Sequence, residues 1–206
     1  MGRIKIGIVS ENPRNDGEPI ATLLERYFPN QGLECRQLNT KFSTNKSGSG
    51  LDTEKFTIQL EAICAEYEPN FVLFVRDLDK DKNKKDRLET FENNSKRIQP
   101  EPPEQSIICL HLLFIYEIEA LALADWQTTQ SVLEWKDKKQ QMPTKVKTNT
   151  KDAKGFVSDY FKYSEGDMNK LAEYFDLNVL KTYGVWNDFI AEIMGKILTN
   201  QSKHER

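Results

Sequence analysis

The sequence has few of the residues and segments that mark disulfide-rich, zinc-binding or membrane proteins. Its 206 residues include three cysteines, an odd number spread along the chain, and two histidines. These counts disfavour a disulfide framework and a zinc site. The chain does not begin with a signal-peptide pattern, and its longest apolar stretch, 107–115, is too short to cross a bilayer as a helix. We therefore expect a reduced, cytoplasmic protein with no membrane partner.

The sequence also lacks a strong charge of either sign. It has 29 Lys and Arg against 32 Asp and Glu, which gives a formal net charge of -3. No global field of this size would draw the protein onto a nucleic acid, so any such contact must use a local basic patch. With 38% hydrophobic and 30% charged residues, the composition is that of a folded protein with one sizeable core.

Short apolar runs typical of strands alternate with segments of helical periodicity. Strands are expected at 3–9, 33–38, 71–75 and 106–115, and the main helices are expected at 20–28, 53–67, 117–135 and 186–197. This order predicts an α/β fold with an open, mainly parallel sheet flanked by helices and joined by right-handed crossovers. We expect a core at 1–135 and a helical C-terminal region at 136–206 that packs on it.

Acidic residues stand where the predicted strands end. Glu11 follows the first strand, and Asp77 and Asp79 follow the third. Ligands of open α/β sheets bind beyond the carboxyl ends of the strands, so these three side chains could meet. Clustered carboxylates repel one another unless a cation neutralises them, and Mg²⁺ or Mn²⁺ suits oxygen ligands. The sequence thus indicates a divalent-metal site.

Other interpretations of the Asp77 and Asp79 pair remain. The loop could simply be solvated. An EF-hand is disfavoured because Lys82 stands at the position of the turn glycine and Leu88 at that of the bidentate glutamate. A haloacid-dehalogenase-like phosphatase also has Asp-x-Asp after a strand, but usually near the first strand and without Lys80 in the next position.

A further acidic group follows the fourth strand. If 117–135 is one helix, Glu119 lies on an apolar face near Trp126, where a carboxylate is costly without a metal or an arginine. The alternative is that Glu119 has no functional role and only interacts favourably with the helix dipole at the N-terminus of this helix. We predict that Glu119 belongs to the same site as the acids of the first and third strands.

These acids carry a resemblance to a known family. The sequence resembles the TOPRIM-type nuclease-like proteins grouped with RloB in bacterial defence loci. The segments that carry the resemblance are Glu11, Asp77-Leu78-Asp79, Glu117-Ile118-Glu119-Ala120 with Asp125, Met142-Pro143-Thr144-Lys145 and Tyr160-Phe161-Lys162. Together they span most of the chain, and each motif is short.

The resemblance implies a TOPRIM Rossmann-like core and phosphodiester chemistry with Mg²⁺ or Mn²⁺. In that family pattern Glu11 is the first catalytic acid and Asp77 and Asp79 bind metal, and we expect Glu119 to act with them as a catalytic and metal-binding acid. The chain is too short for a topoisomerase gate and lacks the zinc region of a primase, which favours hydrolysis of DNA or RNA. The family also implies antiphage defence and an ATPase partner.

Basic residues could bind the nucleic-acid backbone without reading its sequence. One group lies beside the Asp77 motif and includes Lys80 and Arg87, and a second lies in the later connector and includes Lys139 and Lys145. The first group is interleaved with acids, so it could equally be a solvated surface. The exposed faces of the C-terminal helices could support a homodimer.

Two further interpretations remain open. TOPRIM proteins commonly have glycine directly after the first glutamate, where this chain has Asn12, so a noncatalytic TOPRIM-like binding or regulatory module is the main alternative to an enzyme. A phosphate-handling receiver or phosphatase would be phosphorylated at Asp77.

Cys109 and His111 share one face of a predicted strand, and we expect them to be core residues instead of a nucleophile and base.

Overall fold

The computed structural model describes residues 3–38, 51, 53–77, 84–99, 106–114, 117–137, 141, 143, 146–148 and 152–204. The described strands form one parallel sheet in the order β2-β1-β3-β4. They are β1 (Ile4–Ser10), β2 (Leu33–Gln37), β3 (Phe71–Asp77) and β4 (Ile108–Phe114). The predicted open α/β architecture with parallel strands is therefore confirmed.

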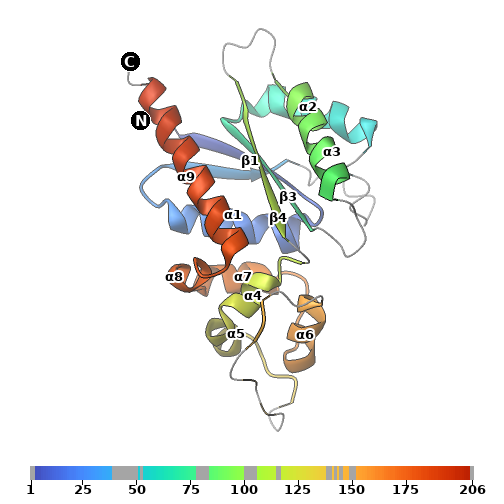
Figure 1. Ribbon diagram of the computed structural model, residues 1–206, viewed down its shortest axis with the longest axis vertical. Helices are drawn as coiled ribbons and strands as arrows, with labels where there is room; N and C mark the ends of the chain where they lie inside the picture. Colours follow the sequence, from blue (N-terminus) through green and yellow to red (C-terminus); the bar gives the residue numbers. More distant parts are fainter. Residues whose placement is uncertain are drawn as a thin grey trace.

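Alternating side chains of the central strand β3 face two separate hydrophobic clusters. Phe71, Leu73 and Val75 belong to the larger cluster, whereas Val72 and Phe74 belong to the smaller one. Each face of the sheet is thus covered, which explains why β3 is an almost continuous apolar run. Figure 1 shows α2 and α3 on one side of the sheet and α1 and α9 on the other.

The smaller cluster is closed by α2 (Glu54–Tyr67) and α3 (Lys84–Arg97). The Thr53 hydroxyl caps α2 by accepting the N–H of Phe56 at 3.2 Å. The two helices are joined by a buried hydrogen bond, in which the Thr57 hydroxyl donates to Asn94 Oδ1 at 2.8 Å. Because one polar side chain satisfies the other, this contact can be buried without a large desolvation cost.

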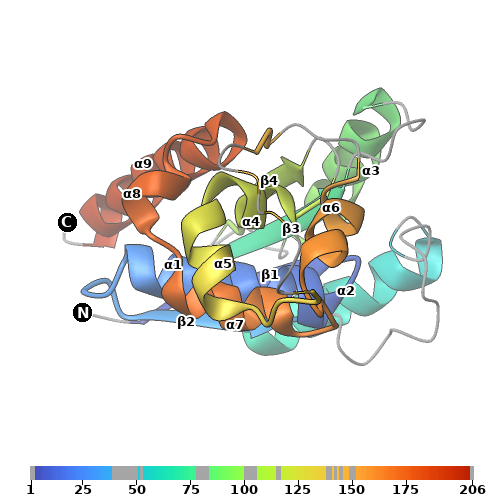
Figure 2. The same ribbon diagram turned by 90° about the horizontal axis from the view of Figure 1, so that it is seen from below.

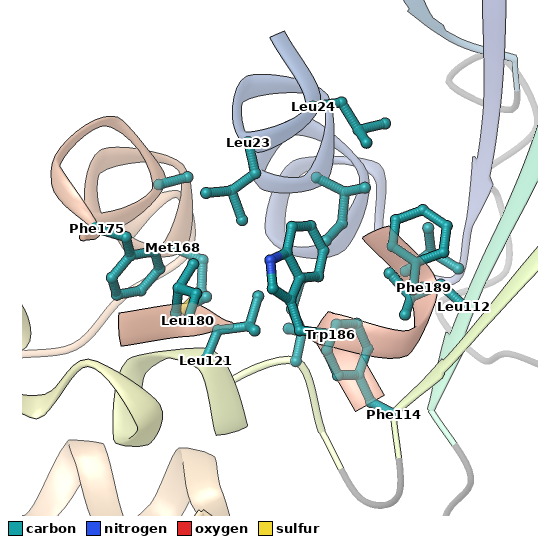
Figure 3. Packing of buried hydrophobic residues seen from close by; sticks show 14 of the residues in the cluster. Leu23, Leu24, Leu112, Phe114, Leu121, Met168, Phe175, Leu180, Trp186 and Phe189 are labelled. Atoms are coloured by element: carbon teal, nitrogen blue, oxygen red, sulfur yellow. The ribbon is translucent and has the colours of Figure 1, made fainter. Parts of the chain in front are cut away.

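The larger cluster is covered by α1 (Glu18–Tyr27), α7 (Asp167–Tyr174), α8 (Leu177–Leu180) and α9 (Gly184–His204). Trp186 of α9 is fully buried at its centre, among residues of α1, β4 and the α7–α8 region (Figure 3). Its indole N–H donates to the Tyr27 hydroxyl at 3.1 Å. The cluster contains residues from both predicted regions, 1–135 and 136–206, so the C-terminal helices share the main core.

A group of short helices lies beyond the carboxyl ends of the strands. It comprises α4 (Ala120–Ala124), α5 (Trp126–Val132), α6 (Ala153–Tyr160) and α7. Figures 1 and 2 show this group gathered at the end of the sheet where β4 leads toward α4. These helices therefore enclose the edge at which the sequence places its acidic residues.

The expected helix over 117–135 is broken into two. The break is at Asp125, whose backbone leaves the helical region at φ -108° and ψ 65°. Its carboxylate accepts the N–H of Thr128 at 3.2 Å, as an N-cap of α5, and the N–H of Asp176 at 2.7 Å. The prediction of one continuous helix over 117–135 is therefore wrong.

None of the helices in the described ranges combines the length and the apolar character that crossing a bilayer requires.

Candidate active site

The turn after β1 carries two acids, Glu11 and Asp16. Pro13–Gly17 forms one π-helical turn, and the Asn12 side chain begins it by accepting the N–H groups of Arg14 and Asn15. Asp16 is buried, and its Oδ2 accepts the N–H of Asn12 at 2.8 Å. The turn thus folds Asp16 back toward the end of the strand instead of into solvent.

At the end of β3, Arg76 and Asp77 point to opposite faces of the sheet. Ser10 of β1 pairs with Val75 of β3, so the same register aligns Glu11 with Arg76. The Arg76 Nε donates to Glu11 Oε1 at 3.2 Å, and the Arg76 side chain is only 4% exposed. Glu11 and Asp77 therefore end adjacent strands, as predicted, but their side chains diverge.

Glu119 lies between β4 and α4. It stands at the N-cap of α4 and is 4% exposed, and its Oε1 accepts the hydroxyl of Tyr163 at 3.0 Å. Nearby Glu117 Oε2 accepts the backbone N–H of Lys154 at 2.8 Å, at the start of α6. The described hydrogen-bond donor to the Glu119 side chain is thus a tyrosine, whereas the sequence suggested a metal or an arginine as its partner.

The acids from the three strand ends influence one another. Burial raises the pKa of Asp77 well above its usual range, and the negative charges of Asp16, Glu119, Glu11 and Glu117 raise it further. We call these five residues the acidic cluster. The cluster joins carboxylates that are far apart in the sequence at one edge of the sheet.

Burial also raises the pKa of Asp16 and Glu119, the two acids of the cluster that are buried. The pKa of Asp16 rises to about 7, mainly because the side chain is desolvated and then because Glu119 and Glu11 are negative. The pKa of Glu119 is raised by burial and by Glu117, against the Tyr163 hydrogen bond and the Lys154 charge. Strongly perturbed acids at a sheet edge are typical of functional sites.

The chemistry of the cluster fits a hard divalent cation. All its side-chain donors are carboxylate oxygens, and among the described residues their negative charge exceeds the positive charge of Arg76 and Lys154. Within those residues, no three His, Cys, Asp or Glu side chains form a group ready to hold a metal ion. Mg²⁺ needs only one or two carboxylates, because it keeps several of its waters. The carboxylates of Asp77, Asp16 and Glu119, which act on one another electrostatically, could supply one or two such ligands.

Several predicted site residues lie outside the described residues, namely Asp79, Lys80, Lys139 and Lys145. Arg87 lies within the helix α3, and its side chain is not described. A basic residue that is described near the cluster is Lys154, whose side chain is exposed. Its positive charge lowers the pKa of both Asp16 and Glu119.

The sequence interpretation missed Asp16, Arg76 and Tyr163. The available signal for Asp16 is that it is a second acid in the turn after Glu11. The position of Arg76 beside Glu11 depends on the alternation of side chains along β3 and on the alignment of β1 with β3. The sequence alone does not provide that alignment. Tyr163 carries no sequence signal of its own, because only the chain path brings it to Glu119.

Cys109 and His111 lie on the other face of β4. The His111 ring stacks on Phe91 of α3 with centroids 4.7 Å apart, and both ring nitrogens are buried without a hydrogen-bond partner among the described residues. Burial raises the pKa of the Cys109 thiol and, with the Arg76 charge, lowers the pKa of His111 to about 4. A neutral thiol and a weakly basic imidazole do not form a reactive pair.

His111→Leu is expected to stabilise the protein, and more so at acidic pH. The ordinary pKa of 6.5 falls to about 4 on folding, so the folded state binds the proton less tightly and loses stability as pH falls through this range. Leucine also removes two unsatisfied polar atoms, and the expected gain is about 1 to 3 kcal/mol at pH 5. Urea unfolding of both proteins at pH 5 and pH 7.5 measures it. An equal difference at the two pH values would contradict the assignment to His111.

Comparison of the chain with protein-family models, with curated proteins and with solved structures finds no match.

Proposed function

We propose that the protein is a Mg²⁺- or Mn²⁺-dependent nuclease of TOPRIM type that hydrolyses phosphodiester bonds of DNA or RNA. The observation that carries this proposal is that the acids Asp16, Asp77 and Glu119 act on one another at the carboxyl end of a parallel sheet, with Asp16 and Glu119 buried and Asp77 partly buried. The sequence resemblance supports a cytoplasmic role in bacterial antiphage defence, with an ATPase partner.

The residues of the cluster have different parts in the proposed reaction. Asp77, Asp16 and Glu119 would hold the metal, together with Asp79 of the sequence motif. When bound, such an ion polarises a phosphoryl oxygen and lowers the pKa of a bound water. Lys154 is exposed beside the acids and would bind a substrate phosphate through its ammonium group.

Glu11 would act at the margin of this site. Its carboxylate is held by the buried guanidinium of Arg76 at 3.2 Å, which fixes its position relative to the end of β3. A buried arginine and carboxylate that pair in this way are costly to separate. Glu11 would therefore take part as an oriented general base or outer partner of the metal waters.

The second candidate is a noncatalytic TOPRIM-like module, and the Glu11–Arg76 ion pair favours it. In that case the first acid of the motif serves to join β1 to β3 instead of binding metal. Metal titration separates the two candidates. An enzyme is expected to gain about 2.7 kcal/mol of stability at a metal concentration one hundred times Kd, whereas a module gains nothing.

The proposal is tested by cleavage of plasmid, single-stranded DNA and tRNA with Mg²⁺, with Mn²⁺ and with EDTA. Asp77→Asn is the active-site variant, and Asp188→Asn is the matched control, since Asp188 is an exposed acid on α9. We expect the wild type and the control to cleave at least one substrate with metal. Cleavage that persists in EDTA or in Asp77→Asn would contradict the proposal.

A further inference from the structure

One short segment of the C-terminal region forms three hydrogen bonds with two of the segments that carry the acidic cluster, the turn after β1 and the residues that lead into α4. We call residues 152–167 the brace segment. The N–H of Lys154 donates to Glu117 at 2.8 Å, the Tyr163 hydroxyl donates to Glu119 at 3.0 Å, and the N–H of Gly166 donates to Asn15 Oδ1 at 2.9 Å. The last contact holds the turn of Asp16, the residue after Asn15.

Of these three contacts, the one from Tyr163 uses a side chain and can be removed cleanly. Glu119 is buried, and a desolvated carboxylate requires a hydrogen-bond donor. The Tyr163 ring is half-buried, which restricts its rotation, so its hydroxyl presents a fixed donor to one carboxylate oxygen. A fixed donor on one oxygen limits the carboxylate to a narrow range of orientations.

From these contacts we propose that Tyr163 is a positioning residue, which orients the Glu119 carboxylate for metal binding without itself touching metal or substrate. This inference rests on the proposed metal-dependent function. It adds to that function a residue from the helical C-terminal region, so the metal site depends on parts of the chain on both sides of residue 135. Outer partners of metal ligands commonly change metal affinity or activity by roughly 10- to 100-fold.

The test compares Tyr163→Phe with the matched control Tyr160→Phe. Both changes remove one hydroxyl from the same part of the chain, but the Tyr160 ring packs on Trp126 and Phe156. Mn²⁺ affinity is measured by calorimetry on the initially metal-free proteins, and cleavage is measured separately. We expect Tyr163→Phe to weaken Mn²⁺ binding roughly 10- to 100-fold, and Tyr160→Phe to keep the wild-type affinity.

A double-mutant cycle links the effect to Glu119. In the Glu119→Gln background the ligand charge is already lost, so Tyr163→Phe should weaken Mn²⁺ binding no further. A merely structural role would instead give the same loss in both backgrounds, which would overturn the proposal. A Tyr163→Phe protein that does not fold, as judged by circular dichroism, would also overturn it, because it would assign the hydroxyl to the core.

The outcomes separate this inference from the proposed function. If the wild type binds and uses Mn²⁺ and Tyr163→Phe behaves identically, only the positioning role is wrong. If the wild type binds no Mn²⁺, both the metal-dependent function and the positioning role are wrong. Weakened binding in Tyr163→Phe alone, absent in the Glu119→Gln background, supports the proposal.

Discussion

Asp77→Asn is expected to abolish metal-dependent cleavage while making the metal-free protein more stable. Asp77 is desolvated among four other acids, so its ionised form is unfavourable in the folded state without a cation. Asparagine has nearly the same shape and carries no charge. We expect cleavage to fall at least about 100-fold, because loss of even an outer partner of a metal ligand costs about 10- to 100-fold.

The gain in stability is the more diagnostic half of this result. Replacing an acid that stabilises the fold lowers the free energy of unfolding. Replacing an acid that is kept for function in an unfavourable environment raises the free energy of unfolding. Thermal and urea unfolding in EDTA at pH 8 measure the gain, with Asp188→Asn as the control. A destabilised Asp77→Asn protein would show that Asp77 serves the fold.

The second large effect is a loss of stability of the metal-free protein as pH rises. The pKa of Asp16 increases from 3.8 to about 7 on folding, so the folded state holds this proton more tightly than the unfolded chain does. The stability that results is fully present below pH 3.8 and is lost as pH rises through about 7. From the size of the shift, the loss is at most about 4 kcal/mol.

Urea unfolding between pH 5 and pH 8 in EDTA checks this expectation, with Asp16→Asn measured in parallel. His111 changes the stability in the opposite direction below pH 6.5, so the difference between wild type and variant is the quantity that isolates Asp16. Saturating Mn²⁺ at pH 8 should restore the wild type and leave Asp16→Asn little changed. The same pH profile in both proteins would contradict the role given to Asp16.

Much of the fold follows from local sequence patterns. The run Phe71–Val75 is apolar on both faces because both faces of β3 are covered, and the helix of 186–197 has a single buried stripe that begins at Trp186. Each strand ends where its apolar run stops. The sequence therefore predicts that Glu11 and Asp77 lie at the carboxyl ends of β1 and β3, as they do. These features depend only on the periodicity of apolar residues within a short stretch of the sequence.

The details of the site depend on contacts between distant segments, and the sequence could not provide them. The β1–β3 register decides that Glu11 aligns with Arg76 and points away from Asp77. The helix break at Asp125 is stabilised by the N–H of Asp176, which lies 51 residues later. Glu119 was expected to need a partner, but only the path of the brace segment identifies Tyr163.

The two hydrophobic clusters are completed at different times as the chain is synthesised. The smaller one contains residues between Val9 and Cys109 only, whereas the larger one extends to Ile197. A nascent chain can therefore finish the α2–α3 layer while the opposite face of the sheet still lacks α7 and α9. The residues of the smaller cluster leave the ribosome before those of α7 and α9.

This order has a consequence for the acids. A chain that ends before residue 152 contains all five carboxylates of the acidic cluster but lacks the N–H of Lys154 and the hydroxyl of Tyr163 that hold Glu117 and Glu119. On the proposed function, the metal site would thus be complete only when the brace segment, residues 152–167, has left the ribosome. On the proposed function, fragments that end before residue 152 are expected to bind the metal ion more weakly than the complete chain.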